Sequence, residues 1–456
     1  MSMWRAPHQT PAQAGRPEEQ HGEAVQDSGS DEARDPRHET QSTGSALLVA
    51  ALTRENLQRA LKRVRANKGA AGVDGLDIDQ TAEHLRTAWP AIREQLLSGT
   101  YRPSPVRRVT IPKPDGSGER ELGIATVTDR LIQQALLQVL QPILDPTFSE
   151  HSYGFRPGRS AHDAVLAAQS YVQSGRRVVV DVDLSQFFDR VDHDILIDRL
   201  QKRIGDPGVI RLIRAYLNSG VMVEGVVQRR TMGTPQGSPL SPLMANVMLD
   251  EVDKALERRG HCFARYADDA NVYVRSRRAG ERVMALLRRL YGKLRLTVNE
   301  TKSAVASVFG RKFLGYAFWV APGGVIKRRV AAKPIATFKQ RIRQLTRRSG
   351  GRSLPDVVDR LRTYLLGWKG YFRLAQTPRV WRELDQWLRH RLRAIQLKQW
   401  KRGTTTYREL TKLGAQPDVA RQVAANSRRW WRNSGMLLNA VLTLAWSDQL
   451  GLPRLS

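Results

Sequence analysis

Two adjacent aspartates, Asp268 and Asp269, lie at the centre of an otherwise apolar and aromatic stretch, "FARYADDANVYV". Adjacent carboxylates repel each other, and burying either one is costly unless a positive partner neutralises it. A divalent metal ion is one such partner. A third aspartate, Asp183, follows the β-branched run in "RRVVVDVDLSQFF". Three carboxylates at strand ends could hold two Mg²⁺ ions, which in phosphoryl transfer activate an attacking oxygen and hold a leaving pyrophosphate.

A simpler interpretation fits the same residues. Aspartate suits turns, so an Asp-Asp pair at a hairpin bend does not by itself require a metal. Asp181 shares a strand face with Asp183 and could be only a solvated neighbour. These few residues therefore leave both interpretations open, and the choice depends on the rest of the chain.

The elements that must position these aspartates can be predicted from apolar periodicity. The aspartate pair lies at the bend of a hairpin with strands at Phe263–Tyr266 and Ala270–Val274. A second hairpin, near residues 104–124, has its turn around Asp115, Gly116 and Gly118. Helices are expected as one continuous segment after Ser45, near residues 82–99, and at Asp129–Leu144, Val209–Leu217 and Leu243–Arg258. This order of elements predicts an α+β fold with helices on one face of a sheet.

The composition favours a polyanionic partner. The 456 residues carry 74 Lys+Arg against 44 Asp+Glu, a formal net charge of +30, and nucleic acid is the usual partner of so basic a chain. No long apolar run predicts a membrane span. The single cysteine, Cys262, excludes an internal disulfide and a zinc site built from several thiolates, which fits a reducing cytoplasm. No secretory signal is expected either.

The basic charge is unevenly distributed. Residues 1–44 contain 4 Arg, no Lys and 8 Asp+Glu and are rich in Gly, Pro, Gln and Ser, which predicts a disordered tail. Residues 338–456 contain 25 Lys+Arg against 7 Asp+Glu, together with 7 of the 10 Trp. Their pattern is helical throughout and predicts a separate basic helical domain.

Seven blocks of the sequence resemble group II intron reverse transcriptases in content and order. They are "IPKPDGSGERELGI", "HSYGFRPGRSAHDAV", "VVDVDLSQFFDRVDHDIL", "TPQGSPLSPLMANVMLDEVD", "RYADDANVYV", "LTVNETKS" and "KFLGYAF". The resemblance extends from about Leu47 to the C-terminus. It implies a right-hand polymerase, with the fingers and palm of a reverse transcriptase followed by an all-α thumb or maturase domain. The boundaries expected on this basis are a tail at 1–44, an N-terminal RNA-binding extension with the start of the fingers at 45–100, fingers and palm at 101–333, thumb and maturase (X) domain at 334–425, and a C-terminal DNA-binding-like tail at 426–456.

The resemblance also implies roles for individual residues. Asp183, Asp268 and Asp269 match the catalytic aspartates that hold two Mg²⁺ ions. Lys113 and Arg120 match the fingers residues that clamp the incoming triphosphate, where an Arg can bind bidentately. Taken singly, each of these two cations would more simply be a solvated charge.

Four further residues match positions that contact the substrates. Phe188 matches the aromatic wall that excludes a ribose 2′-hydroxyl, although a core residue would look the same. Gln236 matches an amide near the nascent base pair, and Tyr266 matches a tyrosine beside the primer terminus. Lys302 matches a lysine near the active site. In "ELGIATVTDR", Ala125 stands where the family usually has a proline.

The two ends of the chain indicate intron-specific roles. The segment "TRENLQRALKRVRANKGAAGVDG" matches an N-terminal extension of intron-encoded enzymes. "YLLGWKGYFRLA" and "RHRLRAIQLKQWKR" resemble the maturase domain, where basic helices could follow an RNA backbone and Tyr371, Trp387 or Trp400 could stack on bases. Most of these aromatic residues could equally be core. The final segment resembles bacterial members that lack the homing endonuclease, so second-strand cleavage is not expected.

The sequence thus predicts an RNA-directed DNA polymerase that binds its group II intron RNA and assists splicing and mobility by target-primed reverse transcription. Its expected partners are the intron RNA, an RNA template, a DNA primer or target, and dNTPs; no membrane partner is expected. Its expected location is the bacterial cytoplasm, in association with the nucleoid. Two alternatives remain open, an RNA-binding splicing factor with a relic polymerase site and a reverse transcriptase recruited to phage defence. The sequence leaves open the oligomeric state, the intron and the DNA target.

Overall fold

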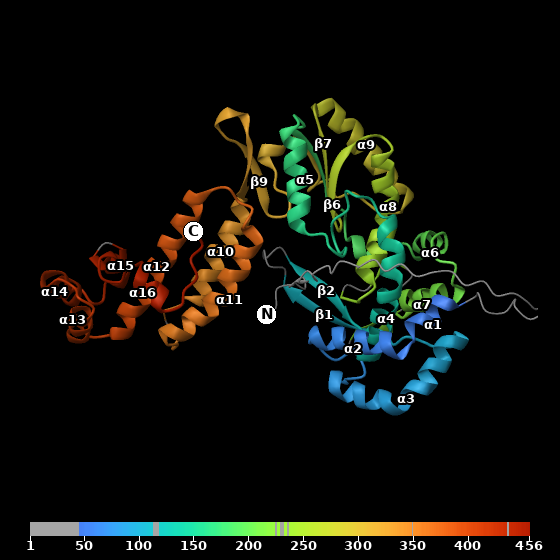
Figure 1. Ribbon diagram of the computed structural model, residues 1–456, viewed down its shortest axis with the longest axis horizontal. Helices are drawn as coiled ribbons and strands as arrows, with labels where there is room; N and C mark the ends of the chain where they lie inside the picture. Colours follow the sequence, from blue (N-terminus) through green and yellow to red (C-terminus); the bar gives the residue numbers. More distant parts are fainter. Residues whose placement is uncertain are drawn as a thin grey trace, which may run out of the picture. The chain divides into compact units, whose positions relative to one another are not determined.

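The computed structural model describes residues 45–112, 118–223, 226–228, 232–234, 237–348, 350–435 and 437–456 (Figure 1). The chain divides into two units, Met1–Thr43 and Gly44–Ser456. The first unit, and with it the expected tail at 1–44, lies outside the described residues. The elements below all belong to the second unit.

From residue 45 onward, three helices precede the first described strand: α1 (Ala46–Ala51), α2 (Arg54–Ala66) and α3 (Ile78–Ser98). The prediction of one continuous helix over the first two is wrong, because Thr53 takes an extended conformation at the start of α2. Asn56 stabilises this break, since its amide donates to the carbonyl of Ala51 at 2.8 Å and to that of Ala135 at 3.0 Å. The Asn56 side chain thereby gives the last carbonyl of α1 a hydrogen-bond donor and links the chain at this break to the helix that contains Ala135.

The predicted hairpin near residues 104–124 is confirmed as β1 (Val106–Pro112) and β2 (Glu119–Ile124), which pair in antiparallel fashion. Its turn, at 113–117, lies outside the described residues. Strand β4 (Val221–Val223) pairs with β1 in parallel, and β5 (Val226–Gln228) completes a sheet of order β2-β1-β4-β5. Helix α4 (Val127–Leu144) begins two residues earlier than predicted because Thr126 caps it, its hydroxyl accepting from the backbone N–H of Asp129.

A second sheet carries the predicted aspartates. Its strands are β3 (Val178–Val182), β6 (Cys262–Tyr266), β7 (Asp269–Val274) and β8 (Ala304–Ser307), in the order β6-β7-β3-β8. All neighbouring strands in it are antiparallel. The predicted hairpin around the aspartate pair is therefore confirmed, with strand ends within one residue of those expected.

Helices cover both faces of this sheet, so the prediction of helices on one face is wrong. Val180, Val182, Phe263 and Val272 pack against α8 (Ser241–Glu257) and α9 (Arg277–Lys293). The alternate residues Val179, Ala264 and Tyr273 pack against α5 (Ala161–Gln173). Figure 1 shows α5 and α9 on opposite sides of the strands. Because consecutive strand residues point to opposite faces, the apolar run Val178–Val180 supplies both layers.

The remaining elements of this part join and brace the two sheets. Helices α6 (His193–Gln201) and α7 (Pro207–Asn218) lie between the β3 region and β4, and α7 confirms the helix expected at Val209–Leu217. Short 3₁₀ helices lie in this part at Asp145–Thr147, Phe187–Asp189 and Val308–Gly310, and in the C-terminal part at Pro322–Gly324 and Leu437–Asn439.

The C-terminal part begins with a two-stranded sheet, β9 (Tyr316–Val320) and β10 (Ile326–Val330), and is then helical. Its helices are α10 (Ala332–Leu345), α11 (Leu354–Phe372), α12 (Pro378–Trp400), α13 (Gly403–Lys412), α14 (Pro417–Ala425), α15 (Trp430–Gly435) and α16 (Leu444–Gln449). Leu452 and Leu455 share one hydrophobic core with α11 and α12, while Leu438 and Leu442 share another with α13 and α14. The last residues are thus packed into the helical region.

None of the helices in the described part of the chain is both long enough and apolar enough to span a membrane.

Candidate active site

The turn between β6 and β7 consists of two residues, Ala267 and Asp268. Tyr266 pairs with Asp269 as the last pair of the ladder. Ala267 has φ +59°, in the left-handed region that non-glycine residues seldom adopt. The tight turn fixes where the backbone of Asp268 and Asp269 lies relative to the sheet.

Asp183 directly follows β3, the strand beside β7. The last described pair between these strands is Val182 with Ala270, so one further step in the same register sets Asp183 opposite Asp269. Strand side chains alternate between faces. Asp183, Asp269 and Tyr266 therefore share one face at one end of the sheet, and Asp181 lies on that face two pairs further in, opposite Asn271. The structure brings two of the three predicted aspartates opposite each other, with the third in the adjoining turn.

The electrostatics around Asp269 are those of a site that attracts cations. Burial, and then the carboxylates of Asp181, Asp268 and Asp183, raise the pKa of Asp269 to about 7, while Lys312 opposes the rise. A carboxyl whose pKa is raised in this way binds a proton or a metal cation more readily than an isolated one. The like charges that prompted the metal hypothesis therefore do converge on Asp269.

Lys302 lies next to Asp183. Its Nζ is 3.7 Å from Oδ2 of Asp183, and its side chain remains 64% exposed. The loop that carries Lys302 also holds the backbone of Asp183, since Asn299 N–H donates to its carbonyl at 2.8 Å and Ser303 Oγ accepts from its N–H at 3.0 Å. Lys302 is therefore placed to offset part of the negative charge without burying it.

An ion pair beneath the aspartates was not predicted. Arg311 donates from Nε to Oδ2 of Asp181 at 2.8 Å and from Nη2 to the carbonyl of Lys302 at 2.8 Å. Asp181 is thus a half-buried, paired carboxylate rather than the solvated neighbour that the sequence allowed. In the sequence, Arg311 is only an arginine beside the "KFLGY" block. Its position there does not indicate that it pairs with Asp181, 130 residues away.

The donor set, which consists of carboxylate oxygens, suits a divalent cation that substrate phosphates would help to hold. Mg²⁺ prefers oxygen ligands, keeps several waters and commonly binds through one or two carboxylates plus substrate phosphates. Among the described residues, no group of three or more His, Cys, Asp and Glu side chains is gathered closely enough to hold a metal ion alone. Asp183, Asp268 and Asp269 are the residues that would hold the metal when the phosphates are present.

Phe188 lies on the short 3₁₀ turn that follows Asp183. Its ring meets Phe187 edge-on, with centroids 5.1 Å apart. Its carbonyl accepts from Thr234 N–H at 2.7 Å. The preceding Gln186 has φ +48°, which turns the chain sharply between Asp183 and the ring. Phe188 is half-buried, so it can serve both as a pocket wall and as part of the core.

The remaining predicted residues are less completely described. Lys113 and Gln236 lie outside the described residues. The backbone of Arg120 pairs with Ile111 in the β1–β2 hairpin, but its side chain is not among those described. Tyr266 is described, and its ring lies 6.4 Å from that of Phe155, centroid to centroid.

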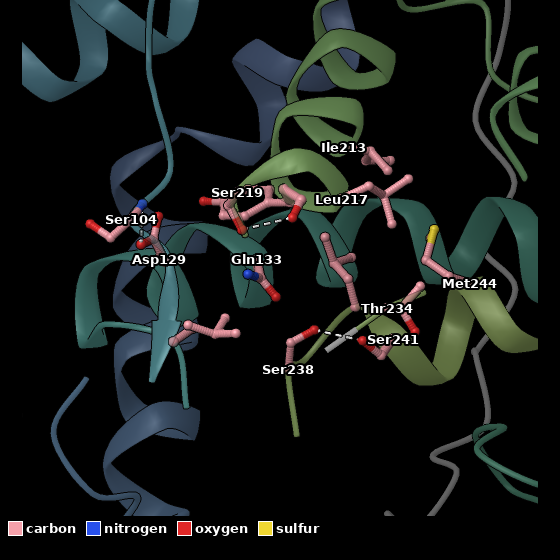
Figure 2. Close-up of a pocket in the computed structure, with 14 residues that line it drawn as sticks. Ser104, Asp129, Gln133, Ile213, Leu217, Ser219, Thr234, Ser238, Ser241 and Met244 are labelled. Atoms are coloured by element: carbon pink, nitrogen blue, oxygen red, sulfur yellow. Dashed lines mark hydrogen bonds between the residues drawn. The ribbon is translucent and has the colours of Figure 1, made fainter. Parts of the chain in front are cut away.

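A cavity of about 30 Å³ lies between α4, α7 and α8, and none of the three predicted aspartates lines it (Figure 2). Asp129 borders it and accepts from Tyr101 Oη at 2.8 Å and Thr126 Oγ1 at 2.7 Å. Within the described residues, Gln133 Oε1 and Thr234 Oγ1 at its wall have no hydrogen-bond partner. A site of this size and polarity accommodates about two water molecules, but not a nucleotide.

Two family models match the chain, one after the other. Residues 111–318 match "Reverse transcriptase (RNA-dependent DNA polymerase)", and residues 335–414 match "Group II intron, maturase-specific domain". The first match contains all three aspartates, and the second begins within α10.

Several curated proteins are similar to part of this chain. Protein YkfC of Escherichia coli is 37% identical over 211 residues, which cover 45% of this chain and 55% of that protein. The group II intron-encoded protein LtrA of Lactococcus lactis is 39% identical over 196 residues, which cover 43% of this chain and 32% of LtrA. Nuclear intron maturase 1 of Arabidopsis thaliana is 36% identical over 89 residues, 20% of this chain and 12% of that protein. The matched region therefore spans about half or less of these relatives.

Among solved structures, the partial Cas6-RT-Cas1--Cas2 complex is similar with a TM-score of 0.36 and 26% identity, over 55% of this chain and 43% of that chain. A score this low carries no conclusion about function. From the two consecutive domain matches and the similarity to LtrA, we conclude that the chain belongs to the group II intron reverse transcriptase/maturase family.

Proposed function

We propose that the protein is an RNA-directed DNA polymerase that also binds its group II intron RNA and assists splicing and mobility by target-primed reverse transcription. The observation that carries this proposal is the meeting of Asp183, Asp268 and Asp269 at one end of the β6-β7-β3-β8 sheet. Burial and the surrounding carboxylates raise the pKa of Asp269, as expected where a cation completes the site.

In the proposed reaction, the primer 3′-hydroxyl attacks the α-phosphate of a dNTP and pyrophosphate leaves. Two Mg²⁺ ions, when bound, would stabilise the charge on the attacking and leaving oxygens. Asp183 and Asp268 would hold them, with Asp269 as the third carboxylate. Lys302, beside Asp183, limits the repulsion among these groups.

We assign the substrate contacts to the residues that the family resemblance singles out. Lys113 and Arg120 would hold the triphosphate, and Phe188 would exclude a ribose 2′-hydroxyl. Gln236 would lie near the nascent base pair and Tyr266 beside the primer terminus. The position of Phe188, five residues after Asp183 and across a sharp turn, supports its part in this assignment.

The C-terminal region supports the proposed RNA partner. Arg343 and Arg391 both lie over the ring of Trp387, at 5.7 and 5.4 Å from its centroid, and Lys398 lies 5.3 Å from that of Trp430. The aromatic rings hold these cations in place, and a group of fixed cations suits a surface that binds phosphates. We retain the domain limits stated above, including the DNA-binding-like segment at 426–456, and propose that the protein acts at the nucleoid in a bacterial cytoplasm.

Primer extension on an RNA template tests the proposal. We expect Asp268→Asn to lower the rate of cDNA synthesis by about 10³-fold or more and to leave the affinity for intron RNA within about twofold, because RNA is bound mainly through basic surfaces. Asp194→Asn is the matched control, since Asp194 is an exposed aspartate on α6 whose side chain is 78% accessible.

The same assay separates the alternatives. An RNA-binding splicing factor with a relic site would bind intron RNA but would extend no primer even as the wild type. Extension by Asp268→Asn at a rate near that of the wild type would contradict the catalytic assignment. An enzyme recruited to phage defence would extend primers but would show no preference for its own intron RNA over an unrelated structured RNA.

A further inference from the structure

Arg265 is buried directly behind the aspartate turn. Only 1% of the residue is exposed, and all five of its N–H donors are used. Nε and Nη2 donate to Asp253, and Nη2 also donates to Ser152 Oγ at 2.8 Å. Nη1 donates to Asn246 Oδ1 at 3.0 Å and to the carbonyl of Ala267 at 2.9 Å. Arg265 therefore connects helix α8 to the turn that carries Asp268.

Residues Ser152–Gly154, here called the backstop segment, run alongside the turn. Ser152 forms a parallel bridge with Arg265. Tyr153 N–H donates to the carbonyl of Arg265 at 2.8 Å. Asn246, which is fully buried, donates from Nδ2 to the carbonyl of Gly154 at 2.9 Å. The backstop segment is thus fastened both to the β6 strand and to α8.

Gly154 is in direct contact with the turn. A Cβ atom at this position would lie 2.3 Å from the backbone nitrogen of Ala267 and 2.9 Å from the carbonyl carbon of Tyr266, whereas ordinary contact begins at 3.4 Å. Both obstacles are backbone atoms, so no side-chain rotation could relieve the clash. Any side chain at this position would push the turn and the backstop segment apart by roughly 1 Å.

We propose that the backstop segment positions the catalytic turn. Gly154 contacts the turn directly, and hydrogen bonds from Asn246 and Arg265 hold the segment in place. This inference rests on the proposed polymerase function. The turn needs such support because Ala267 holds a left-handed conformation that an alanine adopts only when its surroundings enforce it. A displacement of about 1 Å at a catalytic group can lower a rate by about 10²-fold.

A positioning role and a purely structural role predict different kinetics. If Gly154 positions Asp268, Gly154→Ala should lower kcat about 10-fold to 100-fold and leave the KM for dNTP and the affinity for primer–template nearly unchanged. If the segment only supports the fold, stability and substrate affinity should fall together with kcat.

The experiment measures single-nucleotide extension on an RNA template, primer–template affinity and thermal unfolding for the wild type and Gly154→Ala. Gly292→Ala is the control, because Gly292 lies in α9 without a positive φ, and a Cβ added there would meet no atom within 4 Å. We expect the control to match the wild type. A kcat for Gly154→Ala within twofold of the wild type would overturn the proposal, and so would a loss of primer–template affinity parallel to the loss of kcat.

A second variant, at Asn246, removes the hydrogen bond between α8 and the backstop segment. Asn246→Asp keeps the volume and the acceptor for Arg265, but its carboxylate form has no hydrogen to donate to the Gly154 carbonyl. We expect a fall in kcat at unchanged KM, together with faster amide hydrogen exchange in residues 264–270 and unchanged exchange in β3. This exchange can be measured without catalysis, so it tests the inference even if the wild type extends no primer, a result that would refute the proposed function alone. If neither variant folds, the segment serves folding and the positioning proposal fails.

Discussion

Replacing Asp269 with asparagine should stabilise the metal-free protein at neutral and alkaline pH. The pKa of Asp269 is raised from 3.8 to about 7, first by burial and then by the carboxylates of Asp181 and Asp268. The folded state therefore holds a proton that the unfolded state has already released. The stability associated with this proton is present below about pH 4 and is lost as the pH rises to about 7.

The expected change in the free energy of unfolding follows from the size of the pKa shift of Asp269. Each pKa unit corresponds to about 1.4 kcal/mol, so the full shift sets an upper limit of about 4 kcal/mol. Asp269 retains some exposure and water can rearrange around it, so we expect about 2 kcal/mol above pH 7, or about 2 to 4 °C in Tm for a unit of this size. The asparagine of the variant would carry no charge and therefore would show none of this pH dependence.

The assay is thermal unfolding in the presence of a chelator, from about pH 5 to about pH 8. The difference in Tm between Asp269→Asn and the wild type should grow through this range and level off above about pH 7. Added Mg²⁺ should reduce the difference, because the ion binds the charged carboxylate of the wild type. A difference in Tm that does not change with pH would contradict this prediction. So would a variant that is less stable than the wild type at alkaline pH without metal.

Two further predictions concern residues near the aspartates. Phe188→Val should raise the incorporation of ribonucleotides relative to deoxyribonucleotides by about 10-fold to 100-fold, because the ring would no longer occupy the space beside the 2′-hydroxyl. Gel analysis of primer extension with each kind of nucleotide measures this ratio. An unchanged ratio would exclude Phe188 as the residue that selects against ribonucleotides. Arg311→Gln should lower the free energy of unfolding by about 2 to 3 kcal/mol, because it leaves the half-buried Asp181 carboxylate unpaired. Urea denaturation measures this loss, and adding Asp181→Asn should recover part of it; a double variant no more stable than Arg311→Gln would show that the ion pair is not the cause.

The local elements around the site could be predicted because each has a short-range signal. The alternation in "FARYADDANVYV" and the two polar residues at its bend place the β6–β7 strands within a residue of their observed ends. Asp183 could be placed at a strand end for the same reason. The family resemblance then supplied the expectation that these two elements are neighbours.

The features that sequence patterns did not predict depend on contacts between distant residues. The run Val178–Val180 is apolar at every position, so alternation could not show that both faces of the sheet are covered. Arg265 lies in an apolar strand, but its partner Asp253 is on α8, and nothing in the strand itself indicates that pairing. The contact between Gly154 and Ala267 joins segments more than 100 residues apart and becomes visible only once the chain is folded.

The assignment of Asp183 and Asp268 as joint ligands of the metal ions carries the proposed polymerase function. Its most direct test is a crystal structure with primer–template, an unreactive dNTP and Mn²⁺ in place of Mg²⁺, in which anomalous scattering locates the metal. The proposal predicts metal bound by carboxylate oxygens of both aspartates and by the triphosphate. Metal bound elsewhere, or a nucleotide bound with neither aspartate in contact with the metal, would contradict it.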